Sequence, residues 1–503
     1  MASSSRPWRS SSYQKKSSAH RRAQQTRKNF VDRGNCTLTE EVYRELSQTL
    51  HRDLTEPTPI RQIRGASEYF IRQTHLMDIV EHLAFQVHPY SRDKERKKTL
   101  VLATGGTFGS FPDENGRLAP VPGRIVPALK AAFPQSQDKF HFLELQPLID
   151  STASTFFHWN YLAIILWTLV VGPSSAFDSA VVLHGTDTLA DTASALSFMF
   201  WNTTRTIILT GSQHPFCHPV PDSEGIYPIN ELSDAWENFT LACAMARFAY
   251  YKPDRTIDRL LFPGVFVAFR NKVMIGTRVI KAHSTDQDAF DSPNHVPLAR
   301  IITSATTVEM DEELFWIARM ELGSRNFFRS RCAVRYDHIT EISKRTQRRD
   351  STSELYFVLP SVKLDIIHLA PSIYHAEWQS ARTQDSKVQF VRARWNGYHG
   401  IIVNAYGSGN VPDHLQEILL LARKHLGIMV IILTKCPKGS VAPDTYATGA
   451  NQAFWMFQDG THHAAYAKAA CMLSISLTNH KGDTWLQKNM ERSIRGELSQ
   501  TTK

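Results

Sequence analysis

The residues of this sequence that could do chemistry lie in short loops of glycine and hydroxyl side chains. The segment LVLATGGTFGS (100–110) runs from an apolar stretch into Gly105 and Gly106 and then presents Thr107. Glycine permits positive φ angles and a close approach of the backbone to a ligand, so Thr107 would lie on a tightly turned support. A threonine hydroxyl becomes a nucleophile only when a base takes its proton. Thr107 is therefore either a nucleophile or a loop hydroxyl that bonds its own backbone.

A second loop, HGTDT (184–188), places Thr186 directly before Asp187. Asp187 could cap a following helix, since aspartate accepts hydrogen bonds from the first free amides of a helix. Alternatively, it could bind a substrate ammonium group or orient a lysine. The segments IILTGSQ (207–213) and IIVNAYGSGN (401–410) have the same design. Four apolar stretches thus each end in a small loop rich in hydroxyl groups.

The apolar stretches that precede these loops predict the elements that position them. They are short, rich in β-branched residues and apolar at successive positions, as the central strands of a parallel sheet are. The segment LADTASALSFMF (189–200) has helical spacing, so strand, loop, helix and strand follow one another as βαβ units. Ligands of such sheets bind beyond the carboxyl ends of the strands, where the loops lie. The predicted strands of the first half are TLVLA (99–103), AVVLH (180–184), TIILT (206–210) and VFVAF (265–269).

The pattern divides the chain into four zones. Residues 1–95 are a charged extension with one amphipathic stretch, and residues 96–298 form the first α/β domain. Residues 299–354 are less regular and become basic and polar, as a linker or insertion is. Residues 355–503 form a second α/β domain. Its predicted elements are the strands LYFVLP (355–360), GIIVNAYG (400–407) and IMVIILT (428–434) and the helix HLQEILLLARKHL (414–426). The predicted fold class is α/β, with a larger N-terminal open sheet flanked by helices and a smaller C-terminal α/β domain.

The positive charge of the chain is concentrated at its N-terminus. Residues 1–35 hold nine Lys or Arg and one acid, so +8 of the formal net charge of +9 lies there and about +1 elsewhere. A nearly neutral body argues against a nucleic-acid-binding surface. The tail lacks the apolar core of a secretory signal, so it is either a solvated extension or a mitochondrial transit peptide.

The longest apolar run, YLAIILWTLVVG (161–172), is too short for a membrane span and predicts a buried helix. The six scattered cysteines argue against a disulfide framework.

Several segments together resemble the bacterial-type L-asparaginase family, specifically its type I, cytosolic branch. They are ATGGTFGS (103–110), VVLHGTDTLADTASALSFMF (181–200), TGSQ (210–213), GTRVIKAHSTDQDAFDSPN (276–294), YGSGN (406–410), YATG (446–449) and LQKNMERSIRGEL (486–498). The resemblance covers about residues 97–298 and 395–498. It implies the two-domain fold of that family, which agrees with the alternation of strands and helices.

The resemblance also implies catalytic roles. Thr107 matches the family nucleophile that forms a β-acyl-enzyme, although either threonine has been argued to attack. Thr186, Asp187 and Lys281 match the second catalytic cluster. The chemistry suits these residue types, because a lysine desolvated next to a hydroxyl can be neutral near pH 7 and accept a proton. Asp187 would hold Lys281 and pair with the α-ammonium group of the substrate.

Further residues are expected to bind the substrate. LIDSTAS (148–154) aligns with the family's substrate-clamping segment, which makes Asp150, Ser151 and Thr152 candidates for the α-carboxylate end. An ordinary Asx or ST turn would explain the same residues. Asn410 lies where the second domain of the family reaches toward the site of a neighbouring subunit. The resemblance therefore implies a homodimer or homotetramer.

The implied function is hydrolysis of the side-chain amide of L-asparagine to L-aspartate and ammonia through a threonine acyl-enzyme. No metal or organic cofactor, nucleic acid or membrane is expected as a partner, and the expected location is cytoplasmic, with mitochondria as the alternative.

Two other functions stay open. One is a weak or inactive asparaginase-like protein that acts in binding. The other is an ammonia-producing amidotransferase subunit, against which the helical pattern of residues 40–90 argues, because that subunit carries a small barrel there.

The sequence departs from the family pattern at three places. The loop 108–124 lacks the tyrosine that the bacterial enzymes usually carry, and Ala153 stands where an acid is common. An insertion, HPFCHPVPDSEGIYPINE (214–231), follows TGSQ; an arginine is lost there, whereas Asp234 and Asn238 still match. The insertion's His214, Cys217 and His218 have a spacing that fits no zinc motif, so it is predicted to be a structural loop.

Overall fold

The structure is a computed structural model. Apart from two residues, the part of the chain that it describes starts at Lys98. The amphipathic stretch at 68–85 and the helical pattern of residues 40–90 lie outside the described residues. Before Lys98 only the two-residue strand β1 (Thr37–Leu38) is described. The described residues are 37–38, 98–112, 115–133, 140–145, 147–172, 175–200, 203–221, 223, 225, 227–247, 250–251, 257–258, 263–302, 315–319, 331–335 and 355–499.

The centre of the larger sheet consists of parallel strands in the order β5-β2-β6-β7-β10. The sheet continues through the antiparallel strands β11, β14, β16 and β15 and is therefore mixed. The strands are β2 (Lys98–Ala103), β5 (Phe140–Leu145), β6 (Phe177–Leu183), β7 (Thr206–Thr210), β10 (Gly264–Phe269), β11 (Lys272–Ile275), β14 (Ala299–Ile302), β15 (Phe315–Arg319) and β16 (Arg331–Arg335).

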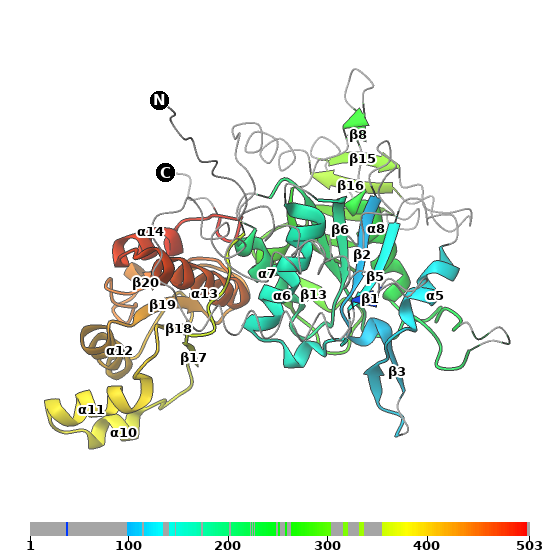
Figure 1. Cartoon of the computed structure of the whole chain (residues 1–503). Helices are drawn as coiled ribbons and strands as arrows, with labels where there is room; N and C mark the ends of the chain where they lie inside the picture. Colours follow the sequence, from blue (N-terminus) through cyan, green and yellow to red (C-terminus); the bar gives the residue numbers. More distant parts are fainter. Residues whose placement is uncertain are drawn as a thin grey trace, which may run out of the picture. The chain divides into compact units, whose positions relative to one another are not determined.

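Both faces of this sheet are buried, which explains its doubly apolar strands. In β2, Val101 and Ala103 belong to a core cluster with residues of α5 and α8 on one face. The alternate residues Leu100 and Leu102 are also fully buried. Successive side chains of a strand point to opposite faces, so the second pair lies on the face of α6 and α7 (Figure 1). The helices are α5 (Ile125–Ala132), α6 (Phe156–Leu166) with the π-helical turn η5 (Trp167–Val171), α7 (Leu189–Met199) and α8 (Ala235–Ala246).

The smaller domain has an all-parallel sheet in the order β17-β18-β19-β20. Its core lies between the sheet and the helices α11 and α12. Figure 1 shows these elements in yellow to red. They are β17 (Leu364–His368), α10 (His375–Ser380), α11 (Gln384–Trp395), β18 (Gly400–Ala405), α12 (Asp413–Leu426), β19 (Met429–Thr434), η9 (Pro443–Thr445), β20 (Trp455–Met456), α13 (His462–Asn479) and α14 (Asp483–Glu491).

Short elements complete the described chain. The hairpin β3–β4 follows the 3-10 turn η2, and the pair β12–β13 carries the segment around Lys281. Among the described residues, no helix has the length and apolar character that crossing a membrane requires. These elements are η2 (Thr107–Gly109), β3 (Ser110–Pro112), β4 (Leu118–Pro120), η4 (Ser151–Ala153), β8 (Tyr250–Tyr251), β9 (Ile257–Asp258), η6 (Gly276–Arg278), β12 (Ile280–Lys281) and β13 (Phe290–Asp291).

Two segments differ from their predicted structure. LYFVLP (355–360) is extended but not a strand, because its amides bond to helices instead of to a neighbouring strand. The Val358 amide donates to Asn160 Oδ1 at 2.9 Å, and the Leu359 amide donates to Ser474 Oγ at 2.9 Å. The zone 299–354, expected to be a linker or an insertion, contributes three strands to the larger sheet in its described parts.

A fully buried ion pair fixes the C-terminal segment to α13. Lys468 Nζ lies 2.6 Å from Glu497 Oε1, and both side chains are 0% exposed. Lys468 also donates to the carbonyls of Met490 and Arg492. Burial lowers the pKa of Lys468, and the charge of Glu497 opposes that shift. Charges removed from water this completely depend on their partners for stability.

Replacing Glu497 with alanine is expected to lower the free energy of unfolding by about 3–5 kcal/mol, because Lys468 would remain buried without a counter-charge. Urea unfolding of the full chain measures this. As the matched control, Glu237→Ala removes the partner of Arg270 from an exposed pair and should cost about 1 kcal/mol or less. Equal losses in the two variants would contradict the assignment of Glu497.

Candidate functional site

The loops that follow β2 and β6 meet at the carboxyl edge of the larger sheet. The Thr104 amide donates to the Leu183 carbonyl at 3.0 Å, and the Thr104 hydroxyl donates to the same oxygen at 2.8 Å. The Ile149 amide donates in turn to the Thr104 carbonyl. Three segments far apart in the sequence are thereby joined at one place. This is the edge at which sheets of this class bind ligands.

Glycines allow these loops to touch backbone to backbone. Gly106 has φ +81°, and a Cβ atom there would lie 2.3 Å from the Cα of Gly185. Gly105 has φ +130°, and its Cβ would lie 2.3 Å from the carbonyl oxygen of Ile149. No side chain fits at either position, and both φ values disfavour other residues. Since Thr107 follows Gly106 and Thr186 follows Gly185, the contact brings the two threonines into neighbouring turns.

Thr107 begins the short 3-10 turn η2 and is half-buried. The turn is fixed by the Gly109 amide and the Ser110 hydroxyl, which both donate to the carbonyl of Gly106. The Thr107 hydroxyl makes no hydrogen bond with any residue that the structure describes. Thr107 thus differs from Thr104, whose hydroxyl bonds the backbone. The alternative of a hydroxyl bonded to its own loop is therefore not what the described residues show.

Thr186, Asp187 and Lys281 form one hydrogen-bonded cluster. Lys281 Nζ donates to Thr186 Oγ1 at 2.9 Å and to Asp187 Oδ1 at 2.7 Å. Thr186 is buried, whereas the Asp187 side chain is 55% exposed. Asp187 does not cap α7, since Thr188 is its N-cap residue and no side chain caps that end. The carboxylate thus holds the lysine and still faces solvent, where a cationic group of a ligand could reach it.

The strand pair that carries Lys281 is anchored by a buried arginine. Arg278 lies in η6, three positions before Lys281, and is 2% exposed. Its Nη1 donates to Asp459 Oδ2 at 2.9 Å and its Nε donates to the Gly496 carbonyl at 2.6 Å. Burial raises the pKa of Asp459, but hydrogen bonds from Ser499 and the charge of Arg278 outweigh it, so the pKa lies below its ordinary value. Residues of the C-terminal domain therefore support the segment of the lysine.

The segment 149–152 packs against the same loops. A Cβ on Gly185 would lie 2.3 Å from the Oγ of Ser151, and the Thr188 hydroxyl donates to the Ser151 carbonyl. Ser151 is buried. Asp150 Oδ1 accepts from the amide and the hydroxyl of Thr152 at 3.0 and 2.9 Å, which is an Asx turn at the surface. The structure thus places Ser151 beside Gly185 and gives Asp150 and Thr152 a local turn.

Asn410 lies in a tight turn of the smaller domain. Its backbone exchanges hydrogen bonds with Tyr406, and its Oδ1 accepts from the Thr448 hydroxyl at 3.3 Å. Among the described residues, none of its hydrogen bonds reaches the cluster around Lys281. The structure does not unite Asn410 with the other candidates within one chain.

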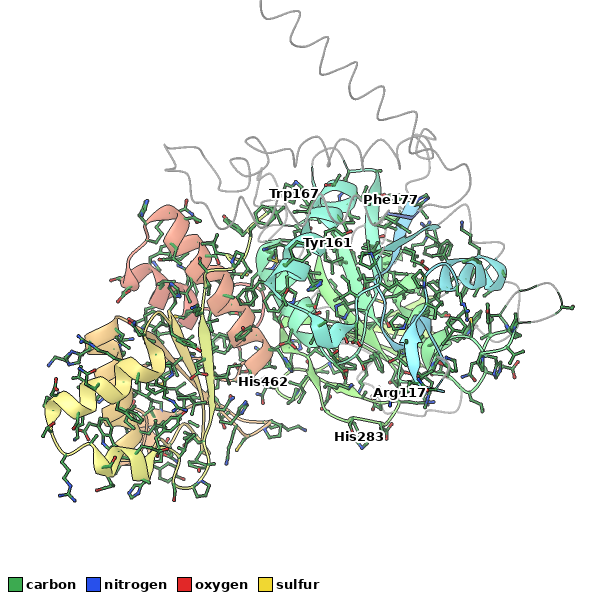
Figure 2. The ribbon with its side chains drawn as sticks, turned by 60° about the horizontal axis from the view of Figure 1, so that its bottom comes forward. Arg117, Tyr161, Trp167, Phe177, His283 and His462 are labelled. Atoms are coloured by element: carbon green, nitrogen blue, oxygen red, sulfur yellow. The ribbon has the colours of Figure 1, made fainter. Side chains whose placement is uncertain are left out.

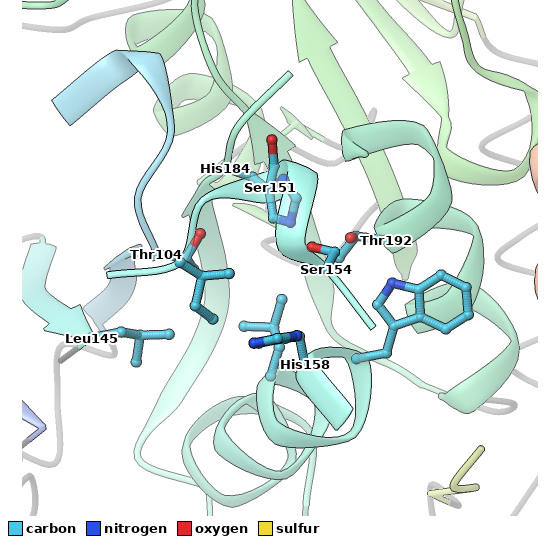
Figure 3. A pocket seen from close by; sticks show the side chains of 10 residues that line it. Thr104, Leu145, Ser151, Ser154, His158, His184 and Thr192 are labelled. Carbon is cyan, nitrogen blue, oxygen red and sulfur yellow. The ribbon is translucent and has the colours of Figure 1, made fainter. Parts of the chain in front are cut away.

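A small cavity with both apolar and polar side chains in its lining lies next to His184 and Ser151. Figure 3 shows the side chains of Ser151, His158 and His184 around it. His184 is buried, its Nδ1 lies 2.8 Å from the Gly185 carbonyl, and burial lowers the pKa of its ring. Thr192 Oγ1 also lines the cavity and has no hydrogen-bond partner among the described residues. The cavity has room for about one water molecule, which such polar atoms would hold. The sequence motif HGTDT contains His184, but nothing in its spacing indicates this position.

The loop after Lys281 is fixed by Gln213. Its Nε2 donates to the carbonyls of Ser284 and Asp286, both at 3.1 Å. The Gln213 amide donates to Asp234, and Asn238 donates to the Gly211 carbonyl. Figure 2 shows His283, in this loop, at the surface of the larger domain. Gln213 of the TGSQ motif, together with Asp234 and Asn238, thus supports the loop that follows Lys281.

In its described residues the insertion is irregular apart from one antiparallel bridge between Cys217 and Ile229. Cys217 is buried, and burial raises the pKa of its thiol to about 12. The structure groups no three His, Cys, Asp or Glu side chains suited to a metal within its described part.

Two family models match this chain, one in each of its two domains. The family model described as "Asparaginase, N-terminal" matches residues 98–314, and the one described as "Glutaminase/Asparaginase C-terminal domain" matches residues 382–490. The L-asparaginase of Thermococcus kodakarensis is 34% identical over 406 residues, covering 80% of this chain and 99% of that protein. L-asparaginase 1 of Escherichia coli (strain K12) is 28% identical over 415 residues, with the same coverage.

One solved structure and one relative with a different name are also similar to this chain. The crystal structure of L-asparaginase I from Vibrio cholerae matches with a TM-score of 0.56 and 27% identity, covering 80% of this chain and all of that one. A glutamyl-tRNA(Gln) amidotransferase component of Methanobrevibacter smithii is 24% identical, and the match covers 83% of this chain and 80% of that protein.

Proposed function

Because this chain belongs to the asparaginase family, as its sequence motifs and two-domain fold predict, we propose that it hydrolyses the side-chain amide of L-asparagine to L-aspartate and ammonia. The observation that carries the proposal is the hydrogen-bonded group of Thr186, Asp187 and Lys281 beside the unbonded hydroxyl of Thr107. A nucleophile and a proton-accepting group in neighbouring turns are what acyl transfer needs.

The reaction proceeds in two half-reactions. The Thr107 oxygen bonds to the amide carbon, and its proton passes through Thr186 and Lys281 to the departing nitrogen. The C–N bond breaks and ammonia leaves an ester on Thr107. Water then attacks the ester, returns a proton to the threonine oxygen and releases aspartate. Backbone N–H groups at the turn of Gly106 stabilise the oxyanion of both steps.

Asp187 and the segment 149–152 bind the amino-acid end of the substrate. One Asp187 oxygen accepts from Lys281, and the exposed remainder of the carboxylate pairs with the substrate α-ammonium group. Ser151, with Asp150 and Thr152 beside it, binds the α-carboxylate. Simultaneous recognition of both groups favours a free amino acid over a peptide. The proposed assembly is a homodimer or homotetramer in which Asn410 of one copy reaches the site of another.

The experiment that tests the proposal is ammonia release by the purified full chain from L-asparagine, L-glutamine and D-asparagine. We expect L-asparagine to be hydrolysed at least about tenfold more efficiently than either alternative, since one extra methylene or an inverted centre misplaces the amide. Release only in the presence of a partner protein and an aminoacyl-tRNA would favour an amidotransferase component, as one relative is named. Absence of release from every amide by a folded chain would contradict the proposal and favour a binding protein.

A further inference from the structure

The segment 213–233, which contains the insertion 214–231, contacts both halves of the proposed site in its described residues. It reaches the turn of Thr107 through aromatic side chains and the loop after Lys281 through hydrogen bonds. These two loops come from different strands, β2 and β12, and the segment links them. The inference below rests on the proposed function, because it concerns the same site.

On the Thr107 side, Phe216 is the main contact. The Phe216 ring stacks on Phe108, the residue directly after Thr107, with centroids 5.1 Å apart and planes at 11°. The Phe216 amide donates to the Phe108 carbonyl at 3.1 Å. Both rings are fully buried. The stack continues through Trp236 to Phe133, at 6.1 and 4.6 Å. The turn of Thr107 is thereby fixed by a backbone hydrogen bond and a column of rings.

A second contact fixes the hairpin that follows this turn. The Tyr227 ring meets Phe111 of β3 edge-on at 4.8 Å. The Arg124 guanidinium lies 5.0 Å from the centroids of both rings. Aromatic and cation–π contacts of this kind stabilise the packing beyond the area they bury. The loop that lacks a tyrosine of its own is therefore packed against a tyrosine from the insertion.

On the Lys281 side, Gln213 and Leu232 hold the following loop. Gln213 Nε2 donates to two carbonyls of that loop, Ser284 and Asp286, at 3.1 Å each. The Leu232 carbonyl accepts from Gln287 Nε2, also at 3.1 Å. The two ends of the segment thus bond to the loop that begins after the catalytic lysine, while its middle reaches the nucleophile turn.

The segment is tied to itself, so that these contacts can act together. The His214 carbonyl accepts from the hydroxyls of Ser212 and Ser233, at 2.6 and 2.8 Å. The Asn230 amide donates to the Phe216 carbonyl at 2.8 Å. Phe216, which contacts the turn of Thr107, is therefore joined by one hydrogen bond to the part of the segment that leads into α8.

We propose that the segment 213–233 is a positioning bridge that sets the turn of Thr107 relative to Lys281. Phe216 and Gln213 are its positioning residues, and they act through Phe108 and through the carbonyls of Ser284 and Asp286. A displacement of about 1 Å between reacting groups can cost about 100-fold in rate. The bridge therefore affects the rate of acylation more than the binding of asparagine.

The test compares Phe216→Ala and Gln213→Ala with Val220→Ala, a control on the same segment whose side chain is 69% exposed. We expect Phe216→Ala to lower kcat by about 10- to 100-fold and Gln213→Ala by about tenfold, with KM changed less than about threefold. Phe216→Tyr keeps the ring and should recover most of the loss. Val220→Ala should retain the kcat of the unchanged protein. Unchanged kcat in the Phe216 and Gln213 variants, or a loss that appears only as raised KM, would overturn the bridge.

Hydrogen exchange separates failure of the bridge from failure of the proposed function. Phe216→Ala should speed exchange of the Gly109 and Ser110 amides, and Gln213→Ala should speed exchange at Asp286 and Asp288, by about tenfold or more. This measurement needs no turnover. If the full chain hydrolyses no amide but the exchange rates change as stated, the proposed function fails and the bridge stands. If it hydrolyses asparagine and both exchange patterns stay unchanged, the bridge fails alone.

Discussion

Replacing Thr107 with alanine is expected to lower kcat for L-asparagine by at least about 1,000-fold, because the attacking oxygen is removed while the rest of the site remains. The substitution removes no hydrogen bond among the described residues, since the Thr107 hydroxyl makes none there. The free energy of unfolding should therefore change by less than about 1 kcal/mol. Ammonia release in the steady state and urea unfolding of the same preparation measure the two effects.

Thr104→Ser is the matched control for this substitution. Thr104 lies three positions earlier, and its hydroxyl donates to the Leu183 carbonyl, a bond that serine can keep. This variant should retain kcat within about tenfold. Acid quenching during turnover, followed by mass spectrometry of the peptides, locates the acyl group. An adduct on the Thr186 peptide, or residual activity above about 10% in Thr107→Ala, would show that Thr107 is not the nucleophile.

Replacing Lys281 with methionine is expected to lower kcat by about 100- to 10,000-fold, the usual contribution of a positioned acid or base. Methionine keeps most of the apolar stem, so the packing of β12 is retained. The loss leaves Thr186 Oγ1 and Asp187 Oδ1 without their shared donor. The dependence of kcat on pH should change together with its magnitude, because a proton-transfer group is absent.

A lysine on the exposed side of α12 provides the comparison. Lys424→Met removes a surface charge outside the loops of Thr107 and Lys281 and should leave kcat unchanged within about twofold. Asp187→Asn tests the same cluster from its other end and should raise KM as well as lower kcat, because the carboxylate would also bind the substrate. If Lys281→Met loses no more activity than Lys424→Met, the hydrogen-bonded cluster is not the catalytic group.

Much of the fold around the site could be predicted from local pattern. β2, β6, β7 and β10 lie where the doubly apolar runs predict strands, because both faces of the sheet are covered by helices. The glycines of ATGGT also predict a tight turn, and the structure shows why, since no Cβ fits at Gly105 or Gly106. The grouping of Thr186, Asp187 and Lys281 came from the resemblance of several motifs, and their hydrogen bonds agree with it.

Other features depend on partners that the local sequence does not contain. LYFVLP has the composition of a strand, but two of its amides donate hydrogen bonds to the side chains of Asn160 and Ser474 instead of to a neighbouring strand. The insertion's prolines and polar residues indicate a loop, and nothing near Phe216 shows that its partner is Phe108. Contacts between distant segments fix these structures, so periodicity and turn signals could not reveal them.

The anchoring of Arg278 has a consequence for synthesis of the protein on the ribosome. The Gly496 carbonyl that accepts from Arg278 lies 218 positions later in the chain, and Ser499, which also bonds the Asp459 carboxylate, lies later still. The strands and both threonines of the larger domain are translated long before these partners, at about 5–20 residues per second. The strand of Lys281 therefore gains its last support only when residues 496–499 leave the exit tunnel. A nascent chain would lack this support for the strand of Lys281 until then, although most of the proposed site had already been made.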